Sequence, residues 1–334
     1  MKKFDVVREI VGNALYQMPR NASAKAFAPT NIALCKYWGK RNQELNLPVT
    51  SSLSISLGKK GTTTEIIVTN NPHDLVFLNN YPVDLTTSFG KRLISFLDLF
   101  RANGVPHFII NTESNIPIAA GLASSASGFA SIVNALNHLF GWNLQEFELS
   151  ILARLGSGSA CRSIWQGFVE WRVGVLDDGM DSYGQKIPET WPQLCIGLLV
   201  LSEHEKALSS REAMQRTVMT SPLYAEWPRK VTHDMHVLKE ALSVRDFELL
   251  GKTAESNAMS MHATMLAAWP PITYLLPDSL VAMRKVWELR QQGLQLYFTQ
   301  DAGPNLKLLF LEQDAETVAI HFPSIEVLQP FNAL

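Results

Sequence analysis

Apolar and polar residues follow each other along this chain with two different periods, which predict strands and helices. Between residues 24 and 68, the segments SSLSISL and TTTEIIV are rich in alternating or β-branched side chains, as half-buried strands are. Pro48 and Gly61 are expected to mark turns between these strands. Across residues 91–102 and 124–140, apolar residues instead recur every three or four positions, which predicts helices.

The remaining segments add elements of both kinds. Strands are predicted at residues 107–115, 166–173, 195–201, 294–299 and 325–331. Helices are predicted at residues 146–155, 214–218, 236–266 and 279–293. At the N-terminus we expect an amphipathic helix that ends near Pro19. Asp5, Arg8 and Glu9 interrupt its apolar stretch, which excludes a secretory signal.

The composition of the chain changes near its middle. Residues 177–192 (DDGMDSYGQKIPETWP) are rich in glycine, proline and acidic side chains, as the segments between domains are. We therefore predict an N-terminal extension at 1–23, a first domain at 24–188 and a second domain at 189–334. In both halves strands come first and helices follow, which predicts two α+β domains rather than a doubly wound parallel sheet.

Composition and charge exclude several classes of protein. The chain has 29 basic and 31 acidic residues, so it lacks the basic excess of a general nucleic-acid binder. Its hydrophobic content of 46% excludes an acidic disordered chain. The sequence contains no run of about 18 apolar residues, so it predicts no membrane span. The cysteines number three (Cys35, Cys161 and Cys195) and are not clustered, which favours a reducing compartment, by default the cytoplasm.

Several common site motifs are missing from the sequence. It contains neither a Walker loop nor a G-x-G-x-x-G dinucleotide fingerprint, and neither G-x-S-x-G nor H-E-x-x-H. His233 and His236 form an H-x-x-H pair in a charged helical stretch. A solvated helix face explains this pair better than a metal site.

Two segments of small residues are candidate anion sites. In PIAAGLASSASG, Gly121 permits tight backbone geometry, while Ser124 and Ser125 stand where a helix begins and its free amides face outward. An ordinary serine helix cap explains this first segment equally well. In the second segment, RLGSGSACRSI, small residues lead to Arg162, whose planar fork suits a carboxylate or phosphate. A surface loop is the alternative there.

Two further segments place charged residues at strand ends. In TNIALCKYWGK, Lys36 and Lys40 are four residues apart, so both could face one side of an extended chain. Two solvated lysines are the simpler interpretation when each residue is taken alone. In TQDAGPN, Asp301 follows a predicted strand and precedes a Gly-Pro turn, a combination that ordinary turns also use.

Taken together, these segments resemble the diphosphomevalonate decarboxylase family of the GHMP kinase superfamily. The resemblance extends from about residue 24 to the end of the chain. It rests on ALCKYWGKR, NLPVTSSLSISL, PIAAGLASSASG, GSGSACRS, MQRTV with TSPL, AWPPITYL and DAGPN, in this order. The family typically has asparagine where Thr50 stands, and the N-terminal extension has no counterpart that we can assign.

The resemblance implies a reaction and its ligands. Family members bind ATP with Mg²⁺ in the cleft between two α+β domains. They convert mevalonate 5-diphosphate to isopentenyl diphosphate, ADP, phosphate and CO₂. A 3-hydroxy acid has no electron sink for decarboxylation, and the sequence marks no site for pyridoxal or thiamine. Phosphorylating the tertiary hydroxyl creates a leaving group instead. The resemblance further implies a homodimer, and it leaves the metal ligands unknown.

The resemblance also implies roles for individual residues. Asp301 matches the family's catalytic aspartate, Lys36 the lysine that acts beside it, and Arg162 the arginine that holds the substrate carboxylate. Lys91 is a further candidate for contact with the diphosphate. The other predicted substrate-binding residues are Tyr37, Trp38, Gly39, Lys40, Ser157, Gly158, Ser159, Ala160, Cys161, Ser210, Arg211 and Met214. The predicted ATP-binding residues are Gly121, Leu122, Ala123, Ser124 and Ser125.

Three alternatives remain open at this point. The first is a decarboxylase acting on mevalonate 5-phosphate, which would keep the same aspartate and lysine. The second is a GHMP small-molecule kinase that stops at the phosphorylated product. The third is a non-enzymatic protein that uses the first domain to bind RNA, although the balanced charge speaks against it.

Overall fold

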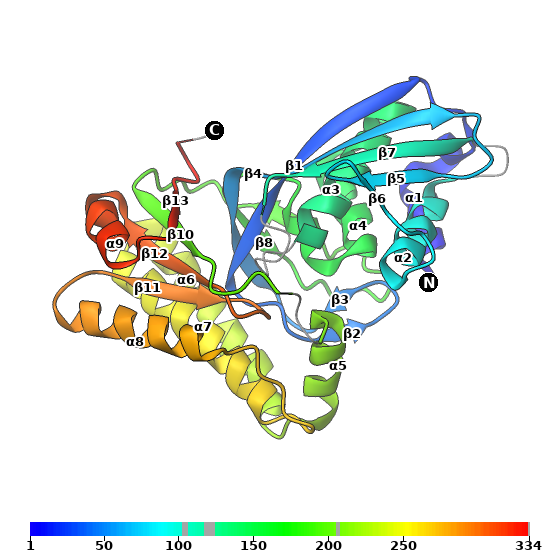
Figure 1. The fold of residues 1–334 in the computed structure, drawn as a ribbon. Coiled ribbons are helices and arrows are strands. Elements are labelled where there is room, and N and C mark those ends of the chain that lie inside the picture. The colour runs from blue at the N-terminus through cyan, green and yellow to red at the C-terminus, as the bar shows by residue number, and fades with distance from the viewer. Residues whose placement is uncertain (102–105, 117–123, 205–207, 333–334) are drawn as a thin grey trace.

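The computed structural model describes residues 1–101, 106–116, 124–204 and 208–332 of the chain. Two β-sheets lie side by side, and each carries its own helices (Figure 1). The helices are α1 (Lys3–Val11), α2 (Ser88–Leu97), α3 (Ser124–Phe140), α4 (Glu146–Gly156), α5 (Ser210–Thr220), α6 (Trp227–Val244), α7 (Phe247–Leu266), α8 (Pro277–Gln291) and α9 (Ala315–His321). The strands are β1 (Ser23–Cys35), β2 (Lys40–Asn42), β3 (Leu47–Pro48), β4 (Ser52–Thr69), β5 (Leu75–Leu78), β6 (Tyr81–Pro82), β7 (His107–Ser114), β8 (Phe168–Trp171), β9 (Gly184–Lys186), β10 (Leu194–Leu199), β11 (Tyr297–Gln300), β12 (Leu306–Leu311) and β13 (Glu326–Leu328).

The first sheet has the order β6-β5-β7-β4-β8-β9, with β1 paired to β4. All its pairs are antiparallel except β5 with β7. Helix α3 packs against β1 and β4 through its apolar stripe, and α4 lies beside it. The helices predicted at 124–140 and 146–155 and the strand predicted at 107–115 are confirmed. The patterns were clear there because one face of each element is buried.

One predicted turn in this sheet is wrong. Residues 52–69 form a single strand, and Gly61 lies inside it opposite Pro29. A Cβ atom at Gly61 would stand 2.2 Å from the carbonyl oxygen of Ala28 and 2.6 Å from the ring of Phe27. The register of β1 against β4 shifts just beyond Pro29. Glycine therefore permits a close approach of two backbones at an irregular pair instead of a chain reversal.

The N-terminal segment belongs to the core of the first half of the molecule. Helix α1 ends at Val11, and a 3₁₀ helix continues to Tyr16, so the helical segment stops short of the predicted Pro19. Val6, Val7 and Leu15 are fully buried against side chains of α2, α3 and α4. The extension is thus held by tertiary packing, which positions its first residues beside α2 and α4.

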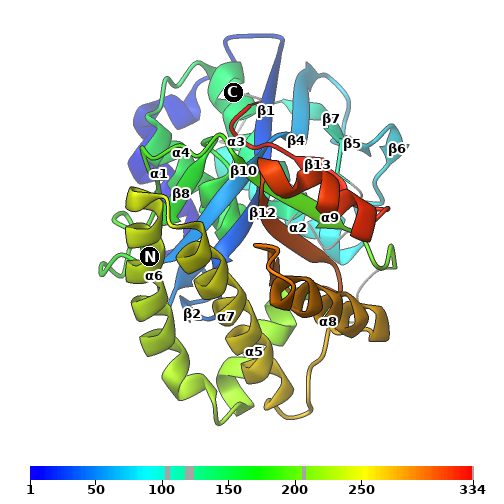
Figure 2. The ribbon, with the colours of Figure 1, turned by 90° about the vertical axis from the view of Figure 1, so that its left-hand side faces the viewer.

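The second sheet has the order β11-β12-β10-β13 and is antiparallel throughout. The single helix predicted at 236–266 is in fact two, α6 and α7. Arg245 adopts a left-handed conformation with φ of 54°, and Asp246 caps α7 by accepting a hydrogen bond from the backbone amide of Leu249. Figure 2 shows α6 and α7 lying side by side in this half, where they pack against each other. None of the described helices is both long and apolar enough to cross a membrane.

The two halves meet along one continuous hydrophobic cluster. It joins Ile32 and Leu53 of the first sheet to Ile196 of the second sheet and Met261 of α7. Helix α7 packs on β1, and α6 packs on both β1 and β4. The stretch between β9 and β10 carries the chain from one sheet to the other, and the predicted boundary at residues 188–189 falls there. That boundary stays a prediction.

Candidate active site

An ion-pair cluster forms where the ends of β1 and β11 meet. Lys36 follows the last residue of β1, and its Nζ lies 2.8 Å from Oδ1 of Asp301, which follows β11. Lys307 of β12 brings its Nζ to 3.4 Å from the other carboxylate oxygen. Both lysine side chains are 2% exposed, whereas that of Asp301 is 25% exposed. The carboxylate is therefore the member of this cluster that solvent or substrate can reach.

Charge decides the protonation state of Asp301. Burial raises the pKa of its carboxyl, but the positive charges of Lys36 and Lys307 and their hydrogen bonds outweigh burial, so the pKa lies well below its usual range. Burial lowers the pKa of Lys36, while the neighbouring Asp301 favours its charged form. Asp301 is thus ionised at neutral pH and can accept a proton only from a group placed directly against it.

Lys36 is anchored both to its own strand and to the second half of the molecule. Its Nζ donates to the carbonyl oxygen of Ala33 at 2.8 Å, and its backbone amide donates to Oδ1 of Asn257 on α7 at 2.8 Å. Asn257 in turn donates to Asp234 of α6 at 2.8 Å. These bonds explain how a lysine can be held buried and aimed at one carboxylate. The interpretation of Lys36 as a solvated lysine is wrong.

Arg162 lies in the same interior with neutral partners. Its guanidinium donates to the hydroxyl of Ser52 at 2.7 Å and to Oδ1 of Asn31 at 3.4 Å, and it lies 5.8 Å from the ring centroid of Trp171. It is 3% exposed, and no carboxylate of the described residues lies within ion-pair distance of it. Burial lowers the pKa of Arg162, and Asp301 is close enough to oppose that shift. An aligned guanidinium without a counterion suits an anionic ligand.

The KYWGK segment divides its residues among different surroundings. The Tyr37 hydroxyl is buried without a hydrogen-bond partner among the described residues, and the side chain of Trp38 is packed into the core at 2% exposure. Gly39 has φ of 122°, and the hydroxyl of Tyr224 lies against it, bonded to the Trp38 carbonyl at 3.0 Å. Any side chain at position 39 would collide with that hydroxyl.

Lys36 and Lys40 do not share partners, although their spacing allowed a common side. Lys40 donates to Oδ1 of Asn46 at 2.7 Å, whereas the ion-pair partners of Asp301 are Lys36 and Lys307. Burial, together with the nearby charges of Arg211, Lys3 and Arg92, lowers the pKa of Lys40 to about 8. Lys40 therefore belongs to a second, positively charged part of the site.

The two small-residue segments come together in space. The hydroxyl of Ser125, in the first turn of α3, lies 3.3 Å from that of Ser157, which follows α4. Ser124 is the first residue of α3, as the sequence predicted, while Gly121, Leu122 and Ala123 lie outside the described residues. The contact between Ser125 and Ser157 joins two segments 32 residues apart into one surface, which is called the hydroxyl-rich wall below.

The second of these segments is compact. Residues Gly158–Arg162 form a 3₁₀ helix, in which Ala160 and Cys161 are fully buried. A Cβ at Gly158 would come within 3.0 Å of both Trp171 and the Tyr37 hydroxyl. Burial raises the pKa of the Cys161 thiol to about 12, so it stays protonated. The Ser159 carbonyl accepts a hydrogen bond from the side-chain amide of Asn31 at 3.3 Å.

The remaining predicted residues lie on α5, which Figure 1 shows beneath β2 and β3. Ser209 caps this helix, and Ser210 begins it. Met214 is buried in the shared hydrophobic cluster, whereas Arg211 is exposed. The charge of Arg211 lowers the pKa values of Lys40, Lys3 and Arg92, and these four residues are called the cation group below.

The sequence interpretation missed several residues of this region. Lys307 had a signal, because a lysine inside the apolar strand LKLLF needs a buried partner. His262 of α7 had none: it is 2% exposed, and burial together with the charge of Lys36 lowers its pKa to about 4. Lys91, a predicted diphosphate contact, is exposed. Its neighbour Arg92, rather than Lys91 itself, belongs to the cation group. His233 and His236 are exposed on α6, as predicted.

Family models and known proteins match the chain over most of its length. A model described as "Diphosphomevalonate decarboxylase-like N-terminal domain" matches residues 28–184, and one described as "Mevalonate 5-diphosphate decarboxylase C-terminal domain" matches residues 196–328. Diphosphomevalonate decarboxylase mvd1 of Aspergillus fumigatus is 39% identical, with 89% of this chain and 78% of the relative covered. The diphosphomevalonate decarboxylase of Saccharomyces cerevisiae is 36% identical, with 87% and 78% covered.

Solved structures share the fold. The mevalonate diphosphate decarboxylase of Staphylococcus aureus superposes with a TM-score of 0.86 at 35% identity, covering 92% of this chain and 95% of that one. A structure described as "MDDEF in complex with MVAPP, AMPPCP and Magnesium" has a TM-score of 0.86 at 40% identity, covering 92% and 96%. The predicted two-domain α+β fold is confirmed by these superpositions.

Proposed function

The chain belongs to the diphosphomevalonate decarboxylase family, and from that premise we propose how its residues carry out the family's reaction. Its activity is the ATP-dependent decarboxylation of mevalonate diphosphate in the mevalonate pathway. The tertiary hydroxyl oxygen takes the γ-phosphoryl group of ATP. The bond to the carboxyl carbon then breaks, its electron pair forms the alkene, and phosphate leaves with the electrons of the C–O bond.

Asp301 is the base of the first step in this proposal. Its carboxylate is the exposed member of the ion-pair cluster, and Lys36 and Lys307 fix one oxygen each. A carboxylate with so low a pKa is a weak base, so its contribution comes from its position against the tertiary hydroxyl. The single observation that carries the assignment is the 2.8 Å pairing of Asp301 with a buried lysine from the other half of the molecule.

Lys36 and Arg162 supply the positive charge around the reacting carbons. Lys36 is held beside Asp301 and would stabilise the charge on the transferred phosphoryl group. The guanidinium of Arg162, oriented by Ser52 and Asn31, would hold the substrate carboxylate and orient its loss as CO₂. No described carboxylate occupies that guanidinium beforehand.

In this proposal, the phosphate groups of both substrates bind to the hydroxyl-rich wall and the cation group. The diphosphate of mevalonate diphosphate would contact Lys40, Arg211 and the Ser157–Arg162 segment. The phosphates of ATP would lie at the start of α3, where Ser125 meets Ser157. Mg²⁺ prefers oxygen ligands, which these hydroxyls offer. The ion would be held there with the ATP phosphates and would neutralise part of their charge.

A stoichiometric assay tests the function. The enzyme is incubated with ATP and mevalonate diphosphate, and CO₂ and ADP are measured together. We expect one CO₂ for each ADP. ADP formation without CO₂ would point to a plain kinase, and faster turnover of mevalonate 5-phosphate would identify that compound as the substrate.

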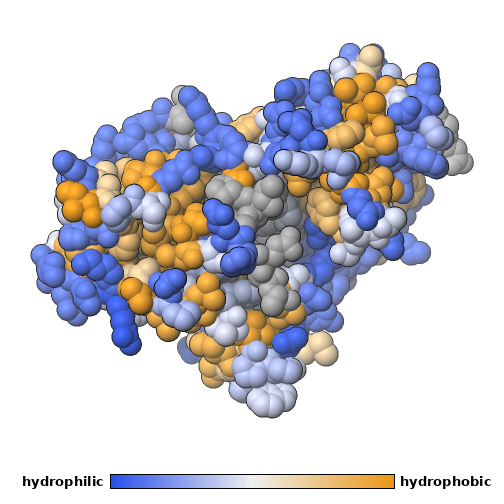
Figure 3. All heavy atoms as spheres, viewed as in Figure 1, coloured by the Kyte–Doolittle hydropathy of each residue, from blue (hydrophilic) through white to orange (hydrophobic). Residues whose placement is uncertain are grey.

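We also propose that the enzyme works as a homodimer in the cytoplasm. The three cysteines are buried as free thiols, which suits a reducing compartment. Apolar side chains reach the surface of the second half (Figure 3), among them Leu280 and Val281 of α8 at 47% and 67% exposure. Apolar surface of this kind supports contact with a second copy. Sedimentation of the purified enzyme would test this proposal.

A further inference from the structure

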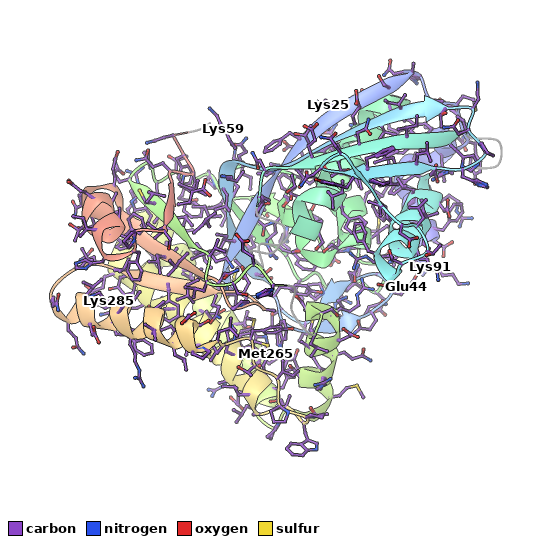
Figure 4. The ribbon with its side chains drawn as sticks, viewed as in Figure 1. Lys25, Glu44, Lys59, Lys91, Met265 and Lys285 are labelled. Atoms are coloured by element: carbon purple, nitrogen blue, oxygen red, sulfur yellow. The ribbon has the colours of Figure 1, made fainter. Side chains whose placement is uncertain are left out.

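A cavity of about 390 Å³ lies between the N-terminal helix α1, α2 and the end of α4. It is lined by Lys3 of α1 and the preceding Lys2, by Arg92 of α2, by Glu44 of the β2–β3 connection and by Gly156 of α4. A volume of this size lies within the range of small-molecule sites. Gly156 directly precedes Ser157, so the cavity adjoins the proposed substrate site. Figure 4 labels Glu44 on this side of the molecule, below α2.

Positive charge dominates this region. Arg211 of α5 affects the pKa values of Lys3, Lys40 and Arg92, and Lys3 and Arg92 affect that of Lys40. Among the described residues, none of these four cations forms an ion pair within 4.0 Å, and Glu44 is the one acidic side chain that lines the cavity. The charge of Glu44 favours the charged form of Lys3, but one carboxylate does not balance four cations. Their remaining repulsion would be removed by a polyanion.

The cations are held in place by neutral contacts. The guanidinium of Arg92 lies 5.3 Å from the ring centroid of Phe129, and its Nε is buried without a hydrogen-bond partner among the described residues. Lys40 is directed by Asn46, whose amide donates to the carbonyl oxygens of Arg154 and Leu155. These contacts orient positive groups and leave their charge available to a ligand.

Lys3 is positioned by the core. It is the first residue of α1, and burial of Val6, Val7 and Leu15 fixes that helix against the first half of the molecule. The helix also begins at the cavity, which Lys2, Lys3 and Phe4 line. The positive end of the helix dipole therefore lies at this cavity.

We propose that the N-terminal extension completes the diphosphate subsite, with Lys3 binding the terminal phosphate of the substrate beside Lys40, Arg92 and Arg211. The proposal rests on the function proposed above and adds a specificity-determining residue to it. Lys3 would then distinguish a diphosphate from a monophosphate, because a single phosphate bound at Lys40 does not extend to α1. This segment lies outside the part of the chain that resembles the family.

Steady-state kinetics of the full-length K3Q variant test the proposal. Glutamine removes the charge, is only one atom shorter than lysine and suits a helix, so α1 is retained. We expect KM for mevalonate diphosphate to rise about tenfold, equivalent to about 1.4 kcal/mol, with kcat and KM for ATP unchanged. K3R should restore the wild-type KM. The matched control is K25Q, which changes an exposed lysine on β1, labelled in Figure 4, and should behave as wild type.

Calorimetry with inorganic diphosphate separates this proposal from the decarboxylase activity. Without ATP or mevalonate diphosphate, K3Q should bind inorganic diphosphate about tenfold more weakly than wild type and inorganic phosphate equally well. An unchanged KM and unchanged diphosphate affinity in K3Q would overturn the proposal. A rise in KM for ATP alone would also overturn it, because the cavity would then take the nucleotide's phosphates. If wild type releases no CO₂, the proposed function fails, whatever the calorimetry shows.

Discussion

The two ends of the proposed site differ in how their charges are balanced. At the acidic end, around Asp301, one carboxylate is paired with two buried lysines, so it has its counterions before any ligand arrives. At the cationic end, around Lys40, four cations share a single acidic side chain, and burial and mutual repulsion lower the pKa values of three of them. The acidic end is organised for chemistry, whereas the cationic end is organised for an anion that the substrate must bring.

Replacing Asp301 by asparagine tests the acidic end with the largest expected effect. We expect kcat to fall by about 10²–10⁴, the usual contribution of a positioned base, while ATP still binds. The measurement is single-turnover CO₂ release together with nucleotide titration. Thermal unfolding is the control, because the change leaves two buried lysines without their counterion. Near-normal turnover would remove the assigned role.

Replacing Arg162 by lysine tests the cation nearest to the reacting carbons. We expect kcat/KM to fall by about tenfold to a hundredfold, because a point charge cannot reproduce the two directed hydrogen bonds that a guanidinium makes to a carboxylate. Ser52 and Asn31 would still be present to align the substitute. Unchanged kinetics in R162K would show that Arg162 does not hold the substrate carboxylate.

Replacing Lys307 by methionine removes one of the two lysines that pair with Asp301, and so tests how far the acidic end depends on both. Asp301 keeps Lys36, but the pKa of its carboxyl should rise, because one of the two cations that lower it is lost. Because Asp301 acts in its ionised form, the acidic limb of the kcat profile should move to higher pH. A profile that matches wild type at every pH would show that Lys307 does not influence the base.

We expect the smallest effect at the cationic end, with a pH dependence opposite to the one that Asp301 causes. Lys40 has a pKa of about 8 in the folded protein against a reference value of 10.5, so it is charged below pH 8 and loses its proton above it. The kcat/KM for mevalonate diphosphate should therefore fall as the pH rises above about 8. Over the same interval the free energy of unfolding should rise, because the unfolded chain binds more protons there. In the K40R variant the decline in kcat/KM should disappear.

Sequence patterns predicted elements best where one face of an element is buried in a regular way. The helix at 124–140 and the strand at 107–115 were found for that reason. Gly61 was misjudged because it accommodates a neighbouring backbone, a tertiary contact that local periodicity does not record. Arg245 was misjudged because the helical spacing of apolar residues continues past it, although this exposed residue adopts a left-handed conformation that ends the helix.

The sequence alone determined which residue types the chemistry has available and on which segments they stand: Asp301 after one strand, Lys36 after another, and the serines where a helix begins. Only the tertiary structure decided how these groups meet. It joined residues 265 apart into one ion pair, added Lys307 to it, and brought Lys3 to the cation group. The physical reason is that covalent order specifies local conformation, whereas burial and charge depend on neighbours that are brought together only when the two sheets and their helices pack.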